Sequence, residues 1–435
     1  MVDHVQGHER GPYCPGAGPR RGRLAYSQPP GPERRRGRRI EESRNVVGVR
    51  GKQEPRSQPH SLVAAAKALQ PLVREQAVLA QEQRHVPEAM VAAMANAGLY
   101  RVAAPACFGG AETDPITAIE VIEAISEADG SIGWVLMIGI ETVGIGGSLM
   151  DPAMAAGLFA AHPDLVMCGA LNPQGRAERV AGGWKVSGQW PFASGCHHAS
   201  FFWGQCKVVG SDPLRLIEVL VPREQYEILD TWHVNGLRGT GSHDVAVREL
   251  FVPDAMITEV AGSKPHHDGP LYRLPPFSRL AYNKVGVSTG IARAALDAFV
   301  VLAEHKQPRL SSRALRERPR AQLNYALAEA ALRSARAFVI DAVMDEWDTV
   351  CAGGVASRRQ RALVRLACSQ ACQEAIRAVE LVHQAAGTSA NQEASPIGKA
   401  RRDVAVVAQQ LMVAPQFIED AGRVLLGLDP LEPIL

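Results

Sequence analysis

Apolar and polar positions alternate with two different periods along the chain. From about Ser61 apolar residues recur every three or four positions, which is the spacing of one face of a helix, and shorter helical patterns follow. Between residues 165 and 252 the period changes to two, which predicts strands over 165–171, 178–186, 201–208, 216–221, 228–233 and 244–252. Long helical patterns then return over 278–306, 315–350, 355–388 and 395–426.

The order of these patterns predicts an α+β, mainly α, multi-domain protein. A chain of 435 residues is long enough for two or three modules. We expect an N-terminal helical domain, a middle β-barrel domain, a Pro/Gly-rich linker and a C-terminal helix bundle, over 61–163, 164–260, 261–276 and 277–435. Residues 1–60 are rich in Arg, Pro and Gly and are predicted to be a disordered basic tail.

Composition narrows the class of partner. A hydrophobic content of 46% with 21% charged residues is typical of a globular protein, and the net charge of +2 argues neither for nor against a polyanionic partner. We expect no nucleic-acid partner and no membrane partner. We find no apolar run of membrane-spanning length, no signal-peptide pattern and no zinc-like spacing among the 8 Cys. The expectation is a cytoplasmic protein with free thiols and no metal.

The most informative stretch is Gly182–Ala199. It is predicted to form two short strands joined by a turn at Ser187-Gly188. The second strand leads into Ser194-Gly195, where an aromatic ring and a hydroxyl could meet a planar ligand. His197 and His198 follow, and on extended backbone neighbouring side chains point in opposite directions, so we expect at most one of them to face a site.

Three motifs carry a resemblance to the acyl-CoA dehydrogenase superfamily. They are the stretch just described, the segment from Trp232 to Asp244 containing Gly-Leu-Arg-Gly-Thr, and the C-terminal Arg401-Arg402-Asp403. The resemblance covers residues 62–432. It implies helices, a β-barrel and a four-helix bundle in that order, a flavin between barrel and bundle, and a homo-oligomer, usually a tetramer.

Within that superfamily the chain is more similar to the flavin-dependent monooxygenases. Dehydrogenases commonly carry a catalytic Glu about eight residues after the Arg-Asp pair, but residues 404–412 contain no carboxylate. The segments 129–134, 169–177 and 190–195 are similar to oxygenase components of two-component aromatic hydroxylases. That branch implies reduced FMN or FAD from a separate NAD(P)H-dependent flavin reductase, O2, a C4a-hydroperoxyflavin and a small aromatic or hydrophobic substrate.

The resemblance also assigns residues. It implies that Ser194 bonds flavin N5 or O4, with His197 and Gln410 as the other candidate catalytic residues. Candidate cofactor contacts are Gly169, Ala170, Asn172, Phe192, Arg238, His383 and Gly387. Candidate substrate contacts are Ser131 and Trp134, and Asp129 to Ser131 is predicted to cap the helix that carries Trp134.

Gln410 departs from the pattern of the hydroxylases. They carry a His seven residues after the Asp of the Arg-Asp pair, and counting from Asp403 gives Gln410, an amide that cannot take a proton near pH 7. Two alternatives therefore stay open beside the monooxygenase: an acyl-CoA dehydrogenase-type enzyme with its base elsewhere, and a non-catalytic binding or assembly subunit. Asp403 itself is predicted to be structural, paired with Arg401 or with an Arg on a facing helix.

Overall fold

A computed structural model describes residues 61–260 and 263–431. The predicted basic tail, residues 1–60, lies outside the described residues. The N-terminal part is helical, as predicted, with α1 Ser61–Gln83, α2 Glu88–Asn96, α3 Pro115–Ser126, α4 Gly130–Leu149 and α5 Pro152–Ala161. The carboxylate of Asp129 accepts a hydrogen bond of 3.0 Å from the Ile132 amide, so the predicted cap of α4 is confirmed.

Helix α4 runs through a glycine-rich stretch to Leu149. Gly144 and Gly147 lie inside its last turns, where they allow neighbouring segments to come close. A Cβ at Gly144 would lie 2.6 Å from the Cβ of Ala103, and one at Gly147 would lie 2.9 Å from the ring of Phe159. Glycine here serves close packing, which overrides its poor helix propensity.

The middle of the chain forms one seven-stranded sheet in the order β5-β6-β2-β1-β3-β4-β7. Its strands are β1 Met167–Val180, β2 Gly183–Trp190, β3 Phe201–Val208, β4 Leu216–Pro222, β5 Glu227–Leu229, β6 Asp244–Pro253 and β7 Ile257–Thr258. Only β1 and β3 pair in parallel among the described strands. Because β4 also approaches β6, the sheet curls around its own apolar core.

The predicted turn at Ser187-Gly188 is wrong. Strand β2 runs straight through these residues, and they form an irregularity in its pairing with β6. A Cβ at Gly188 would lie 2.7 Å from Gly175 Cα, so this glycine allows two strands to approach rather than the chain to turn. The chain reverses instead at Gly182, which has φ +78°.

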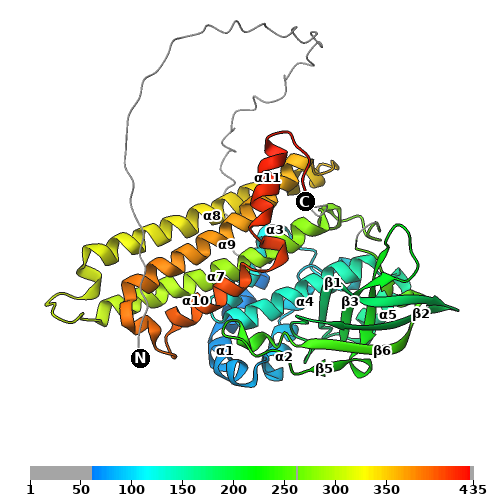
Figure 1. Cartoon of the computed structure of the whole chain (residues 1–435), viewed down its shortest axis with the longest axis horizontal. Helices are drawn as coiled ribbons and strands as arrows, with labels where there is room; N and C mark the ends of the chain where they lie inside the picture. Colours follow the sequence, from blue (N-terminus) through cyan, green and yellow to red (C-terminus); the bar gives the residue numbers. More distant parts are fainter. Residues whose placement is uncertain (1–60, 261–262, 432–435) are drawn as a thin grey trace, which may run out of the picture. The chain divides into compact units, whose positions relative to one another are not determined.

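The C-terminal part consists of long helices, which lie side by side in Figure 1. They are α6 Pro270–Arg273, α7 Pro276–His305, α8 Pro319–Cys351, α9 Arg358–Ala386, α10 Pro396–Val407 and α11 Gln416–Leu425. The single helix predicted over 395–426 is therefore broken after Val407. The amide of Met412 bonds the Gln410 side chain instead of a helical carbonyl, and Pro415 has no N–H to donate.

Helix α4 packs against both the sheet and the bundle, through β1 and α7 (Figure 1). One apolar core joins α1 to α4 with the C-terminal helices, and a second lies within the sheet. Contrary to expectation, α4 and α7 are long and apolar enough to cross a bilayer by length and composition. Their apolar windows are 94% and 61% buried inside the protein, as in core helices of globular proteins.

Two helical glycines test the close packing of α4. Gly144→Ala should destabilise the protein by about 1–3 kcal/mol, because its Cβ meets Ala103 in a packed interface. The control is Gly157→Ala on α5, whose Cβ would meet nothing within 4 Å and should stabilise by up to about 1 kcal/mol. Thermal unfolding of both variants measures the difference; equal shifts would show that the approach of α4 to Ala103 is not tight.

Candidate functional site

A chain of hydroxyl groups runs through the centre of the candidate site. The indole N–H of Trp134 on α4 donates to Ser194 Oγ at 2.9 Å, and Ser194 Oγ lies 2.7 Å from Ser242 Oγ. Ser242 Oγ lies 2.7 Å from Thr240 Oγ1, which donates to the Leu237 carbonyl at 2.8 Å. Ser194 is only 4% exposed, so these bonds are made in a largely dry environment.

The direction of each bond in this chain follows from counting protons. Thr240 uses its only O–H on the Leu237 carbonyl, so it accepts from Ser242. Ser242 has then used its own proton, so it accepts from Ser194. Ser194 thus receives a bond from Trp134 and gives its proton to Ser242, and a ligand acceptor would compete with Ser242 for that proton.

Phe192 lies two residues before Ser194 in an unusual backbone conformation. Its φ is +65°, which is costly for a bulky side chain, and its ring is 66% exposed. The ring meets Trp232 edge-on, with centroids 6.3 Å apart. A strained, exposed aromatic ring beside a buried hydroxyl is an arrangement that a flat ligand could cover.

Strand β1 borders the same turn. It pairs with β3 through Gly169 and Ala170, but the register then breaks, and residues 171–174 have no ladder partner. The Asn172 side chain donates to the Pro191 carbonyl at 3.3 Å, while its Oδ1 is buried without a hydrogen-bond partner among the described residues. Gly169 is packed against Trp203 and Thr142, so its lack of a side chain already has a structural use.

These groups fit a flavin. Phe192 offers a flat apolar surface, and Ser194 can donate to a ligand acceptor that takes its proton from Ser242. Asn172 Oδ1 and residues 171–174, which have no ladder partner among the described strands, offer acceptors. A flavin ring system needs all of these, and its electronic properties depend on hydrogen bonds to its ring atoms.

An ionic clamp, Asp129, Lys399 and Asp403, fixes the elements around this turn. Lys399 Nζ lies 2.8 Å from Asp129 at the start of α4 and 2.6 Å from Asp403, one turn along α10. Asp403 also accepts a bond of 2.7 Å from the Leu237 amide. Burial opposes the charge on Lys399, but the two carboxylates outweigh it and raise its pKa. The predicted partner of Asp403, Arg401, instead pairs with Glu380, because it lies on a different face of α10.

Four histidine rings gather beyond the Ser194 turn. His197 stacks on His85 with centroids 4.5 Å apart, and His198 lies 5.5 Å from the same ring. His243 meets His197 edge-on at 5.1 Å. The expectation that His197 and His198 point in opposite directions is therefore wrong, because residues 194–198 form turns and not a strand.

Burial and neighbouring histidines favour the neutral forms of His197 and His198. They lower the pKa of His197 to about 4 and that of His198 to about 3. The Nδ1 of His243 accepts from the amides of Thr231 and Trp232, which leaves the proton of the neutral ring on Nε2. Through these ring contacts the histidine cluster supports the Ser194 turn. His243 also connects the cluster to the hydroxyl chain, because it is the next residue after Ser242.

The remaining predicted residues lie in different surroundings. Gln410 Oε1 accepts from the Met412 amide at 2.7 Å, in the break after α10. Ser131 is buried one turn before Trp134 on α4, and Arg238 is exposed in a short 3-10 helix. His383 and the exposed Gly387 end α9, where their neighbours are Lys306, Glu380 and Arg401.

Sequence reasoning missed Thr240, Ser242, Lys399 and His85. Thr240 and Ser242 stand inside the segment that carried the resemblance, so their polar side chains in an apolar turn were an available signal. The spacing of Lys399 and Asp403 by four positions on a helix was another. Nothing local in the sequence links His85 to His197, since more than a hundred residues separate them.

Lys399→Met tests the clamp. It leaves two buried carboxylates, Asp129 and Asp403, without their shared cation and should destabilise the protein by about 2–4 kcal/mol. Arg401→Met, two residues later, removes an exposed pair and should cost about 0–1 kcal/mol. Urea unfolding of the two variants is the measurement. If Lys399→Met proved no worse than Arg401→Met, the clamp would not be a main support of the site.

The histidine cluster predicts a pH dependence of stability. Folded His197 and His198 have pKa values below the unfolded value of about 6.5. The unfolded chain therefore binds more protons below pH 6.5, and the free energy of unfolding should fall between pH 6.5 and about 4. His198→Asn should weaken this dependence, whereas His305→Asn at the exposed end of α7 should not. The measurement is the urea midpoint of unfolding of the wild type and the two variants at pH 7.5 and at pH 5. An equal decrease of the midpoint in all three proteins would contradict the prediction.

Comparisons with known proteins identify the family of the chain. The family models described as "Acyl-CoA dehydrogenase, N-terminal domain" and "Acyl-CoA dehydrogenase, C-terminal domain" match residues 63–149 and 284–415. An indole-3-acetate monooxygenase from Pseudomonas putida is 35% identical over 86% of this chain and 97% of its own. An FADH2-dependent resorcinol hydroxylase, oxygenase component, from Rhizobium sp. is 28% identical over 87% and 97%.

A solved structure shows the same fold. The 3-HSA hydroxylase from Rhodococcus sp. RHA1 superposes with a TM-score of 0.81 at 26% identity, over 86% of this chain and 99% of that one. The predicted fold class, and the flavin-dependent oxidoreductase expected from the resemblance, are both confirmed. The chain belongs to the acyl-CoA dehydrogenase superfamily, in the branch formed by the oxygenase components of flavin-dependent monooxygenases.

Proposed function

We propose that this oxygenase component binds reduced FMN or FAD delivered by an NAD(P)H-dependent reductase and hydroxylates a small aromatic substrate. One atom of O2 enters the substrate, the other leaves as water, and the reduced flavin supplies the two electrons. The relatives support this proposal, since the resorcinol hydroxylase is named as an FADH2-dependent oxygenase component.

The observation that carries the proposal is the Ser194 hydroxyl. It is buried, it is held from one side by the Trp134 N–H, and its own proton goes to a neighbouring hydroxyl that can return one. If Ser242 rotates to donate to Ser194, the Ser194 proton becomes free for an acceptor atom on a ligand. Ser194 can thus offer or withhold a hydrogen bond without moving its side chain.

The other residues of the site would bind the flavin and border the substrate. We propose that Phe192 packs on the flavin ring, that Asn172 Oδ1 and the backbone of 171–174 receive its polar edge, and that Trp134 and Ser131 border the substrate. The exposure of Phe192 and the unpartnered Oδ1 of Asn172 support these roles. Gly169, Ala170, Arg238, His383, Gly387 and His197 remain proposed contacts or supports of the flavin site.

Gln410 bears on the kind of ring that is hydroxylated. Its Oε1 already accepts from the Met412 amide, so what remains is an N–H2 group that donates. A donor cannot remove a proton from a phenol, but it can hold a polar substituent or ring atom. We infer a substrate that needs no phenol deprotonation, such as an indole-type ring, in keeping with the named substrate of the Pseudomonas putida relative.

The assembly we propose is a homotetramer in the cytoplasm. Large apolar side chains are exposed on two neighbouring helices of the bundle, including Val301 on α7 at 60% and Leu323 on α8 at 59%. A second copy covering these helices would remove that surface from water. Buried free thiols such as Cys206 and Cys368 fit a reducing compartment.

Reconstitution with a flavin reductase tests the function. The wild type with FMN or FAD, NADH and an indole-type substrate should form hydroxylated product, measured by mass spectrometry against O2 consumed. Ser194→Ala should lower product per O2 about fivefold and release more H2O2, because one hydrogen bond worth about 1 kcal/mol is lost.

Ser211→Ala removes a half-buried hydroxyl in the turn between β3 and β4. It is the matched control and should keep the wild-type ratio. Failure of the wild type both to bind reduced flavin and to oxidise any aromatic probe would overturn the proposed function. An unchanged ratio in Ser194→Ala would remove Ser194 from its proposed role while leaving the function in place.

A further inference from the structure

The hydroxyl chain at Ser194 ends on a carbonyl that is held from several sides. The Leu237 carbonyl accepts from the Thr240 amide at 3.1 Å, from the Trp232 indole N–H at 3.3 Å and from Thr240 Oγ1 at 2.8 Å. Leu237 has a φ of +49°, which is costly for a bulky residue, and its amide donates to Asp403 of the ionic clamp. The last acceptor of the chain is therefore fixed in place, and it keeps two donors if the Thr240 hydroxyl turns away.

The Ser194 oxygen has one position left for a ligand. A serine hydroxyl can take part in three hydrogen bonds, one as donor and two as acceptor. Trp134 and Ser242 occupy two of these positions, and Ser194 has no further hydrogen bond among the described residues. When Ser194 donates to Ser242, the third position is a lone pair, which can accept from a ligand donor. When Ser242 donates to Ser194, the same position carries the Ser194 proton, which a ligand acceptor can bind.

The two directions of the hydroxyl chain differ by one hydrogen bond. In one direction Ser194 donates to Ser242 and Ser242 donates to Thr240, which keeps its own bond to the fixed carbonyl. In the reversed direction Thr240 turns to donate to Ser242, so the bond to Leu237 is lost while the two O–O distances of 2.7 Å can stay the same. One net hydrogen bond corresponds to about fivefold in an equilibrium constant, so the first direction is preferred by that factor.

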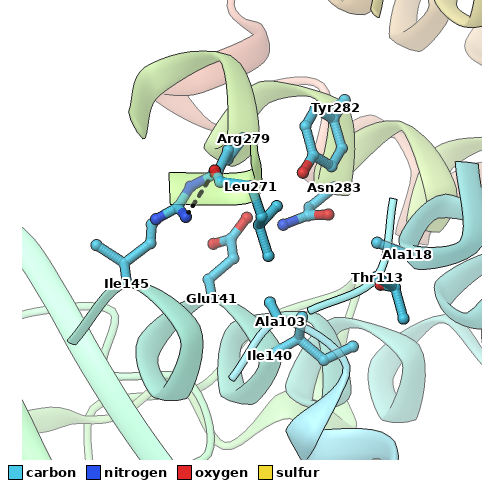
Figure 2. Close-up of a pocket in the computed structure, with 10 residues that line it drawn as sticks. All are labelled: Ala103, Thr113, Ala118, Ile140, Glu141, Ile145, Leu271, Arg279, Tyr282 and Asn283. Carbon is cyan, nitrogen blue, oxygen red and sulfur yellow. Dashed lines mark hydrogen bonds between the residues drawn. The ribbon is translucent and has the colours of Figure 1, made fainter. Parts of the chain in front are cut away.

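No charged side chain of α4 sets the direction of the hydroxyl chain. Glu141 is the one ionisable residue of this helix, about two turns beyond Trp134, and its carboxylate oxygens lie 2.7 and 2.5 Å from Lys284 Nζ. Figure 2 shows the Glu141 carboxylate pointing into a small cavity beside Arg279. Helix α4 thus presents only the neutral Trp134 N–H to Ser194, and the hydroxyl chain is oriented by its own hydrogen bonds.

The two redox forms of a flavin require opposite directions of this chain. In oxidised flavin the ring atom N5 is a hydrogen-bond acceptor, whereas in two-electron-reduced flavin N5 carries a hydrogen and is a donor. A lone pair on Ser194 fits the reduced form and leaves the chain in its preferred direction. The Ser194 proton is needed for the oxidised form, so the chain reverses and Thr240 gives up its bond to Leu237.

We propose that Thr240 and Ser242 make this site selective for reduced flavin over oxidised flavin. Both are positioning residues, because they act through the direction of the Ser194 hydroxyl. The inference rests on the proposed function, in which Ser194 contacts the flavin, and adds the residues that determine which redox form is held. An oxygenase component that receives reduced flavin has to keep it and later release the oxidised form, and this preference serves both steps.

The test compares the dissociation constants of oxidised and photoreduced FMN and FAD, measured anaerobically on the full chain. The wild type should bind the reduced form more tightly. Thr240→Val leaves Ser242 without its acceptor and should lower the ratio of the two constants about fivefold. Thr240→Ser keeps the hydroxyl and should keep the ratio. The control Thr113→Val removes a buried hydroxyl that bonds the Val102 carbonyl and should leave the ratio unchanged.

The midpoint potential of the bound flavin measures the same preference without turnover. A fivefold loss in the ratio should lower the two-electron potential by about 20 mV, since a tenfold change corresponds to about 30 mV. A Thr240 that only supported the fold would weaken binding of both forms alike and leave the potential unchanged. Ser242→Ala interrupts the chain one residue earlier and should lower the potential in the same way, so it replaces Thr240→Val if that variant does not fold.

The possible results separate this inference from the proposed function. If the wild type binds reduced flavin and oxidises an aromatic probe, but Thr240→Val and Ser242→Ala keep the ratio and the potential, the function stands and the positioning role is wrong. A loss as large in Thr240→Ser as in Thr240→Val would also overturn the positioning role. If the preference depends on Thr240 but no probe is oxidised, the positioning role stands and the proposed reaction is wrong. A wild type that binds neither redox form would overturn both.

Discussion

One ammonium group holds together the parts of the structure that make the candidate site. Lys399 joins the beginning of α4 to α10, and through Asp403 it also reaches the turn that begins at Leu237. Trp134 lies on the first of these elements and Thr240 and Ser242 on the last, and all three bear on Ser194. The geometry of a single hydroxyl is thus set by an ion pair formed between residues 270 positions apart in the sequence.

The ionic clamp shows why only part of the site could be predicted from the sequence. The helical and strand periods identified the order of the elements, because an element that buries one face has apolar residues at regular intervals within its own segment. The Ser194 turn could be found from its own residues. The residues that contact Ser194, Asp129 and His197 could not be found in this way. Each of them comes from a distant segment, and only the packed fold brings them together. The local prediction failed at Ser187-Gly188, where the glycine serves close packing of two strands. It failed again after Val407, where a side-chain cap from Gln410 to the Met412 amide ends the helical pattern.

Charge is distributed unevenly through the interior. Around Ser194 the buried polar groups are neutral: hydroxyls, an indole N–H and imidazoles whose pKa values burial lowers. Two helical turns further along α4 the buried groups are ions, namely Glu141, Lys284 and Arg279. Helix α4 thus connects a neutral polar region at Ser194 with a buried ionic region.

The break in the last helix separates position 410 from the packed core. Gln410 lies outside both α10 and α11, and its side chain accepts a bond from the amide two residues ahead. Exchange of a capping side chain costs about 1 kcal/mol, far less than a change in a packed helix interior. The residue at this position can therefore be exchanged while the clamp and the core that hold Ser194 stay intact.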